Sequence, residues 1–87
     1  MLEITKFETQ TILLEADSLI RDLTVINDTY GYDTLVSEFE NGVEIIAQIV
    51  AGFVSIALFI GNVYLPPMGI LELEAVLVEA QPVYQNV

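Results

Sequence analysis

Between Ile45 and Leu71 the chain runs for 27 residues without a charged side chain. Turn-forming residues interrupt this segment at Ala51-Gly52, at Gly61-Asn62 and at Pro66-Pro67-Met68-Gly69. A segment this long and apolar forms either one membrane-spanning helix or several short buried strands. The choice between the two determines the fold class and the functions that are open to the chain.

A spanning helix over residues 45–65 is one interpretation. This stretch of 21 residues is long enough to cross a bilayer, and Ala47, Ala51 and Ser55 form a row of small residues of the kind that packs membrane helices together. Basic residues normally flank such helices, yet the nearest one, Arg21, lies 24 positions before Ile45 and none follows the stretch. A single-pass membrane protein with an acidic N-terminal domain is therefore the alternative interpretation.

The turn chemistry favours strands. Residues 39–43 read Phe-Glu-Asn-Gly-Val, a pattern typical of a three-residue hairpin loop with glycine in the left-handed conformation. The resulting register pairs Phe39 with Val43, Glu38 with Glu44, Ser37 with Ile45, Val36 with Ile46 and Leu35 with Ala47. One face of this hairpin is nearly all apolar, as expected for a half-buried antiparallel pair.

Two further segments continue the pattern. Gly61-Asn62 suits a type II′ turn and predicts that Phe59 pairs with Tyr64 and Leu58 with Leu65. After the break at Pro66-Pro67, residues 70–80 alternate between apolar and acidic side chains at first and are expected to form another strand. Short strands with turns every 8–12 residues are typical of a small sandwich or barrel.

The N-terminal third has mixed patterns. Apolar residues at helical spacing predict an amphipathic helix over residues 9–24, whereas residues 2–7 alternate like a strand and residues 23–26 resemble a short one. The fold class predicted from the whole sequence is mostly β: a small antiparallel sandwich or barrel built from hairpins, with at most one short N-terminal helix. Residues 1–87 are expected to form a single domain.

Composition limits how such a domain is stabilised. A chain of 87 residues buries a small core, and without cysteine it has neither disulfides nor thiolate metal sites. Its hydrophobic content of 54% is high for a monomer of this size. Association with other chains is the expected source of further stability, and a homo-oligomer, in particular a trimer, is predicted.

The charge is strongly negative, because 13 acids face only Lys6 and Arg21 and give a net charge of -11. Nucleic acids and anionic membranes are therefore disfavoured as partners, while a protein with a basic docking surface is favoured. Residues 1–6 lack the pattern of a signal peptide, so we expect the protein to act without export, in the cytoplasm of the producing cell or in a virion. A membrane location belongs to the alternative interpretation alone.

Candidates for chemistry are few. Asn27, Asp28 and Asp33 offer oxygen ligands for a cation, but the spacing of a calcium loop is missing and a solvated turn is expected. Glu38, Glu40 and Glu44 gather near the first hairpin without any pattern that indicates a pocket. The chain has no histidine and no nucleophile or phosphate-loop motif, so we predict a non-enzymatic protein without metal or cofactor.

The leading functional hypothesis is a structural subunit that self-associates and packs on a larger assembly, most specifically a virus or phage capsid decoration (cement) protein. A single-pass membrane subunit and an acidic protein that mimics DNA are the alternatives. The self-association surface is expected at Phe53, Ile56, Leu58, Ile60, Tyr64 and Leu65. Contacts with the larger partner are expected at Tyr30, Tyr32, Glu72, Glu74 and Glu79.

Overall fold

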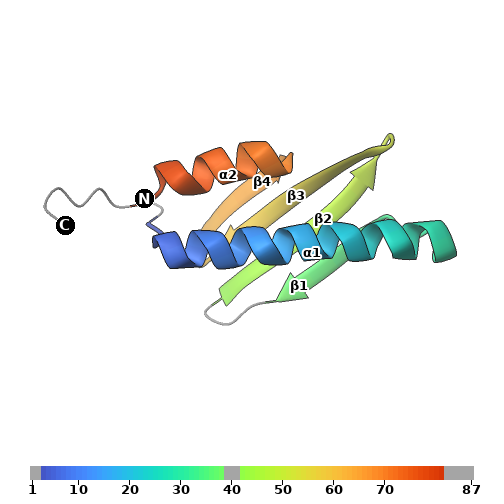
Figure 1. Ribbon diagram of the computed structural model, residues 1–87, viewed down its shortest axis with the longest axis horizontal. Helices are drawn as coiled ribbons and strands as arrows, with labels where there is room; N and C mark the ends of the chain where they lie inside the picture. The colour runs from blue at the N-terminus through green and yellow to red at the C-terminus, as the bar shows by residue number, and fades with distance from the viewer. Residues whose placement is uncertain (1–2, 39–41, 82–87) are drawn as a thin grey trace, which may run out of the picture.

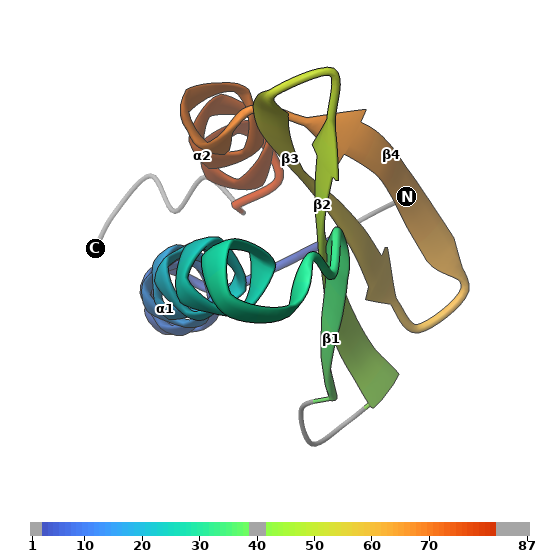
Figure 2. The same cartoon turned by 90° about the vertical axis from the view of Figure 1, so that its right-hand side faces the viewer.

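A computed structural model describes residues 3–38 and 42–81 of the chain. The elements follow one another as α1 (Lys6–Tyr30), β1 (Thr34–Glu38), β2 (Val43–Val50), β3 (Phe53–Ile60), β4 (Val63–Met68) and α2 (Ile70–Glu79). The four strands form one antiparallel sheet in the order β1-β2-β3-β4. Both helices lie on the same side of this sheet, α1 toward β1 and β2 and α2 toward β3 and β4 (Figures 1 and 2).

The long first helix is fixed at both ends. The Thr5 hydroxyl accepts a hydrogen bond from the Glu8 amide, and the Glu8 carboxylate accepts one from the Thr5 amide, both at 3.0 Å. This capping box satisfies two of the amides that a helix start leaves unpaired. At the other end Gly31 adopts φ 76°, and its amide donates to the Asn27 carbonyl oxygen at 2.8 Å. Glycine reaches this left-handed conformation without steric cost, so the helix ends there.

The core lies between the helices and the sheet. One side of α1 buries Ile12, Ala16, Leu19 and Leu23 at helical spacing. Leu73 and Leu77 of α2 point to the same cluster, one helical turn apart. To this core the sheet contributes four side chains that are 0% exposed: Ile45, Ala47, Ile56 and Leu58.

The two ends of the described chain are held together beside this core. The Ile4 amide donates to the Ala80 carbonyl oxygen at 3.3 Å, and the Gln81 side-chain amide donates to the Thr9 hydroxyl at 3.1 Å. Ile4 and Thr9 are both buried. The start of α1 is thereby tied to the end of α2, which keeps both helices on the same face.

The predicted hairpins are confirmed. Strands β1 and β2 pair with Glu38 opposite Glu44, Ser37 opposite Ile45, Val36 opposite Ile46 and Leu35 opposite Ala47. Strands β3 and β4 pair with Phe59 opposite Tyr64 and Leu58 opposite Leu65. At the second turn Gly61 has φ 58° and Asn62 does not have a positive φ, as a type II′ turn requires. The predicted pairing of Phe39 with Val43 lies outside the described residues.

The predicted sandwich or barrel is wrong, because helices replace two of the expected strands. Residues 23–26 belong to α1, which runs from residue 6 to residue 30 and exceeds the predicted 9–24. Residues 70–79 form α2 although their leucines and glutamates alternate. Leucine, glutamate and alanine are strong helix formers, and Leu73 and Leu77 also satisfy the helical period. The fold is therefore a four-stranded sheet with two helices on one face.

The membrane alternative is also corrected. Residues 45–65 belong to β2, β3 and β4 and not to a single helix. In the part of the chain that the structure describes, no helix has both the length and the apolar character needed to cross a bilayer.

Candidate functional site

The face of the sheet opposite the helices is not covered by any described element (Figure 2). Because side chains alternate along a strand, the register assigns the residues of this open face. They are Thr34, Val36 and Glu38 of β1, Glu44, Ile46, Gln48 and Val50 of β2, Phe53, Ser55, Ala57 and Phe59 of β3, and Tyr64 of β4. Ten of these twelve side chains are uncharged. We call this set the open face.

Aromatic and aliphatic side chains make up most of the open face. The rings of Phe59 and Tyr64 are 4.6 Å apart at an interplanar angle of 38°, a cross-strand aromatic pair. Beside them Val36, Ile46 and Ala57 form an apolar row across three strands, in which Val36 is 50% exposed, Ile46 is partly buried and Ala57 is 3% exposed. Val50 and Phe53 close the far end and are 64% and 77% exposed. Exposed apolar side chains in one contiguous area are typical of an interaction surface.

The two charges of the open face stand at one end of it. Glu38 and Glu44 are cross-strand partners, which is unfavourable for two like charges in a monomer. The only basic residues of the chain, Lys6 and Arg21, lie on α1, on the other side of the sheet. Arg21 is bonded to Asp17 one helical turn away. The rest of the open face is free of charge.

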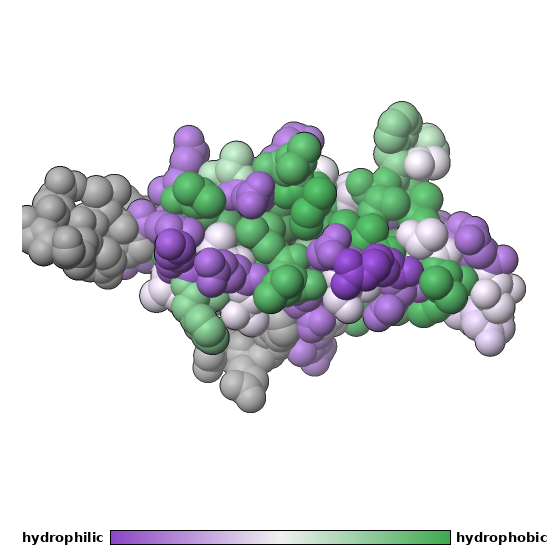
Figure 3. Space-filling model, in the orientation of Figure 1, coloured by the Kyte–Doolittle hydropathy of each residue, from purple (hydrophilic) through white to green (hydrophobic). Residues whose placement is uncertain are grey.

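The helix-bearing side of the molecule has a different character. Hydrophilic and hydrophobic side chains are interspersed over α1 and α2, with hydrophilic groups following α1 (Figure 3). Phe7, Leu14 and Leu71 are more than 70% exposed there, but charged residues separate them along the helices. A mixed surface of this kind is ordinary for a protein exposed to water.

The structure divides the predicted self-association residues between the two faces of the sheet. Phe53 and Tyr64 lie on the open face. Ile56 and Leu58 are 0% exposed in the chain's own core, and Ile60 and Leu65 are partly buried against it. These four side chains point toward the helices, and Ile56 and Leu58 are not accessible to a second chain. Val36, Ile46, Val50, Ala57 and Phe59 are the other apolar residues of the open face and were not predicted as site residues.

The predicted partner contacts do not form one surface. Tyr30 and Tyr32 stack at 6.0 Å between ring centres at the end of α1, where the Asn27 side-chain amide donates to the Tyr32 carbonyl oxygen at 2.7 Å. Glu72, Glu74 and Glu79 lie on α2, toward the opposite end of the molecule (Figure 1). Glu72 and Glu79 share a stripe of this helix, but Glu74 lies about 200° round the axis from Glu72. All five side chains are exposed.

The described residues offer little for chemistry. Within residues 3–38 and 42–81 no three acidic side chains converge on a point that suits a metal ion. Asn27 caps the loop after α1 through the Tyr32 carbonyl oxygen, which gives this polar turn a structural role. The open face is thus the main candidate site among the described residues.

Comparisons with known proteins do not assign this chain to a family. No protein-family model, no curated protein and no solved structure matches it.

Proposed function

We propose that this protein is a non-enzymatic assembly subunit that associates with a second copy of itself through the open face. The observation that supports this proposal is the uncharged apolar area formed by Val36, Ile46, Ala57, Phe59 and Tyr64 on the side of the sheet that its own helices leave bare. Two such faces pack as a sandwich of sheets about 10 Å apart. Packing of this kind removes apolar surface from water, which is the main favourable term in association.

The size of the open face suits a weak pair. The four strands hold 5, 8, 8 and 6 residues, and at about 3.3 Å by 4.8 Å per residue they give an area of roughly 430 Å². Two copies would bury about 860 Å², which is the size range of weak, transient interfaces. A flat face packs on one partner, so we propose a dimer in place of the trimer expected from composition.

Electrostatic repulsion favours one orientation of the two copies in the proposed dimer. Each chain has a net charge of -11, so copies repel one another except where a surface is free of charge. A twofold axis across the strands places Glu38 and Glu44 of one copy near Val50 and Phe53 of the other. Glu44 and Val50 are six residues apart on β2, so the carboxylates of the two copies would be separated by about 20 Å. This distance exceeds the Debye length of about 8 Å at physiological salt, and repulsion there is weak.

A dimer of this kind leaves both helical sides outward. Most of the acids lie on those sides, which suits a larger assembly that offers a basic surface. The narrower hypothesis of a capsid decoration protein stays a prediction. Co-sedimentation of the purified protein with particles of a virus that encodes it would test this hypothesis. Failure to bind the particles would rule out a role in capsid decoration and would not affect the dimer proposal.

The dimer is tested by sedimentation equilibrium with two matched variants. Phe59→Lys places a positive charge on the open face opposite Glu44, where it can form an ion pair that limits the cost to folding. Leu14→Lys makes the same kind of change at a side chain on α1 that is 72% exposed. We expect the unmodified chain and Leu14→Lys to approach twice the mass of 9.6 kDa, and Phe59→Lys to stay at the mass of one chain.

Circular dichroism melts of the same samples show whether each variant is folded. If Phe59→Lys folds and associates as the unmodified chain does, or if the unmodified chain remains a monomer at millimolar concentration, the open face is not a dimer interface.

A further inference from the structure

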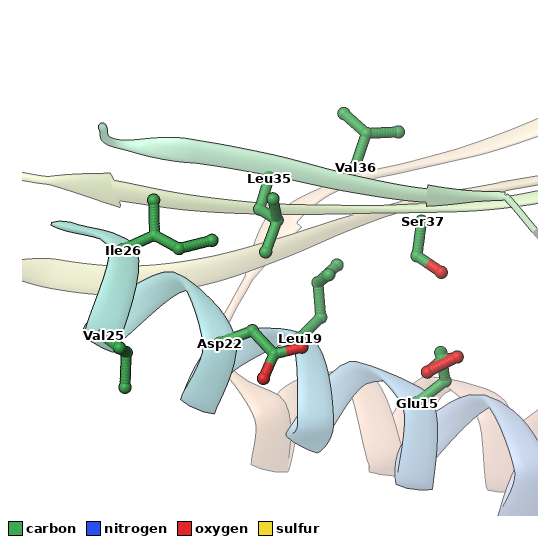
Figure 4. Close-up of a pocket in the computed structure, with 8 residues that line it drawn as sticks. All are labelled: Glu15, Leu19, Asp22, Val25, Ile26, Leu35, Val36 and Ser37. Atoms are coloured by element: carbon green, nitrogen blue, oxygen red, sulfur yellow. The ribbon is translucent and has the colours of Figure 1, made fainter. Parts of the chain in front are cut away.

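A groove runs between α1 and the edge strand β1, on the helix-bearing side of the sheet, and Val36 of the open face also borders it (Figure 4). Leu35 and Ser37 point from β1 toward the helix, and Leu19 rises from α1 between the two carboxylates Glu15 and Asp22. Leu19 is 6% exposed and Leu35 is partly buried, so the floor is apolar. The carboxylates stand on the α1 side of this floor. The groove is open to solvent and has a volume of about 490 Å³.

The backbone of β1 borders this groove with unpaired hydrogen-bonding groups. The Ile49 amide donates to the Asp33 carbonyl oxygen at 2.9 Å, which sets the alternation of bonds between β1 and β2. In an antiparallel pair every second residue bonds to the neighbouring strand, so residues 33, 35 and 37 face β2. The amides and carbonyls of Thr34, Val36 and Glu38 therefore point outward at the edge of the sheet. An edge of this kind can pair with another extended chain.

The other edge of the sheet is different. Strand β4 contains Pro66 and Pro67, which have no amide hydrogen to donate. The pairing of β3 with β4 also shifts register between Ile56 and Leu58, opposite these prolines. Prolines and irregular pairing are common means of blocking an edge strand. Strand β1 has neither feature in its five residues.

The charges around the β1 edge define the partner. Glu15 and Asp22 stand beside the groove, and Asp33 and Glu38 stand at the two ends of β1. No lysine or arginine lines the groove. Two copies of this chain paired edge to edge would bring these acids together, and Lys6 and Arg21 are the only cations that a copy has. The occupant that fits is an extended segment of a different, basic protein.

We propose that the groove between α1 and β1 binds such a segment as a fifth strand of the sheet. Glu15 and Asp22 are seven residues apart, about 10.5 Å along the helix. On an extended chain, side chains four residues apart lie on the same side at a separation of about 13 Å. The segment therefore has a basic residue, then an apolar residue two positions on, then a second basic residue two positions further. Its basic side chains meet Glu15 and Asp22, and its apolar side chain meets Leu19 and Leu35.

A synthetic peptide tests this proposal on the whole chain. The probe has nine residues, with blocked ends, arginine at its third and seventh positions, valine at its fifth and threonine elsewhere. Titration into the isotope-labelled protein is followed by the backbone amide signals in NMR spectra. We expect the largest shifts at Thr34, Val36 and Glu38 and along one side of α1. A peptide with glutamate in place of both arginines is the control and is expected to leave the spectrum unchanged.

Variants of the protein separate the contribution of the carboxylates to peptide binding from that of the β1 backbone. Glu15→Gln with Asp22→Asn should weaken the peptide's affinity about five-fold, since it removes two partly exposed ion pairs. Glu74→Gln with Glu79→Gln makes the same change in net charge on α2 and should leave the affinity unchanged. Val36→Pro should weaken binding at least ten-fold, because it removes an outward amide without breaking a bond to β2.

N-methylated peptides test the same backbone bonds if Val36→Pro fails to fold. One peptide carries methyl groups on the amides of its odd positions and another on those of its even positions. A fifth strand requires that one of the two fails to bind while the other binds normally, because only alternate amides face β1. Three results would each overturn the proposal: equal binding of both methylated peptides, equal affinity of the two double variants, or shifts that are largest at open-face residues of β2 and β3, such as Ile46 and Ala57, and not at β1. The dimer tested by Phe59→Lys is unaffected by any of these outcomes.

Discussion

The two faces of strands β2 and β3 are similar in sequence and different in burial. On the helix-covered face Ile45, Ala47, Ile56 and Leu58 are all 0% exposed. On the open face Ile46 is partly buried and Phe59 is 38% exposed, while the small side chain of Ala57 is 3% exposed. Both faces lack charge over most of their length, yet the helices fill only one of them. Seven of the twelve side chains of the open face are aliphatic or aromatic, and no layer of the described chain covers them.

This difference shows how a chain of 87 residues distributes an apolar content of 54%. A single layer of helices covers one side of a sheet, and a small domain has no further element for the other side. Antiparallel sheets often leave one face to water, but that face is then polar. Here seven of its twelve side chains are apolar, so we expect a second copy to supply the missing layer.

Ile45 and Ile46, which lie on opposite faces of β2, provide the strongest test of the difference in burial between the two faces. Ile45→Ala creates a cavity in the core and is expected to lower the free energy of unfolding by about 3 kcal/mol. Ile46→Ala removes the same atoms from the open face and should cost about 1 kcal/mol in dilute solution, where the protein is monomeric. Urea denaturation at micromolar concentration measures both. Equal losses would mean that the two faces do not differ in burial.

Protein concentration should change the stability of the unmodified chain. If the open face is an interface, each tenfold increase in concentration within the dimeric range adds about 1.4 kcal/mol to the free energy of unfolding of the dimer. Raising the NaCl concentration should strengthen association further, because it screens repulsion between chains of net charge -11. Thermal melts over a hundredfold range of concentration check both effects. A constant melting temperature would contradict the dimer.

The capping box of α1 offers a change that acts on the covered face alone. Thr5→Ala removes the hydroxyl that accepts from the Glu8 amide and should lower stability by about 1 kcal/mol. The open face is on the other side of the sheet, so the mass in sedimentation should not change. Thr11→Ala, at an exposed threonine further along α1, is the control and should have a smaller effect.

The turn between β2 and β3 should allow a small gain in stability. Ala51 has φ 52° and Gly52 has φ 82°, and a left-handed conformation is costly for alanine. Ala51→Asn gives the Asn-Gly pair that such hairpins prefer and should raise the free energy of unfolding by about 0.5 kcal/mol. Gly52→Ala, in the same turn, should lower it. Thermal melts of the two variants would show opposite shifts; shifts of the same sign would refute this account of the turn.

The sequence predicted the hairpins because the turn residues and the alternation are local signals. Gly61-Asn62 and the register of Val36 with Ile46 are read directly from neighbouring residues. The second helix was missed because Leu73 and Leu77 fit a period of two as well as one of 3.6. The start of the first helix was missed although Thr5 and Glu8 have the spacing of a capping box.

The candidate site was predicted only in part, for a reason that lies in the tertiary structure. Alternation separates the two faces of a strand but does not say which of them the helices cover. The predicted interface therefore combined Phe53 and Tyr64 of the open face with Ile56, Leu58, Ile60 and Leu65 of the covered face. The groove beside β1 could not be predicted, because it depends on where α1 lies over the sheet.

Contacts between the two copies are the most direct test of the central proposal. A sample that mixes isotope-labelled and unlabelled chains gives NMR cross-peaks only from atoms of different chains within about 5 Å. We expect such cross-peaks from the Ile46 methyl groups to aromatic protons of Phe53 or Phe59 of the other copy. Cross-peaks confined to helix residues such as Leu14 and Leu71, in a sample whose mass is doubled, would show that the protein associates through its other side and that the open face is not the interface.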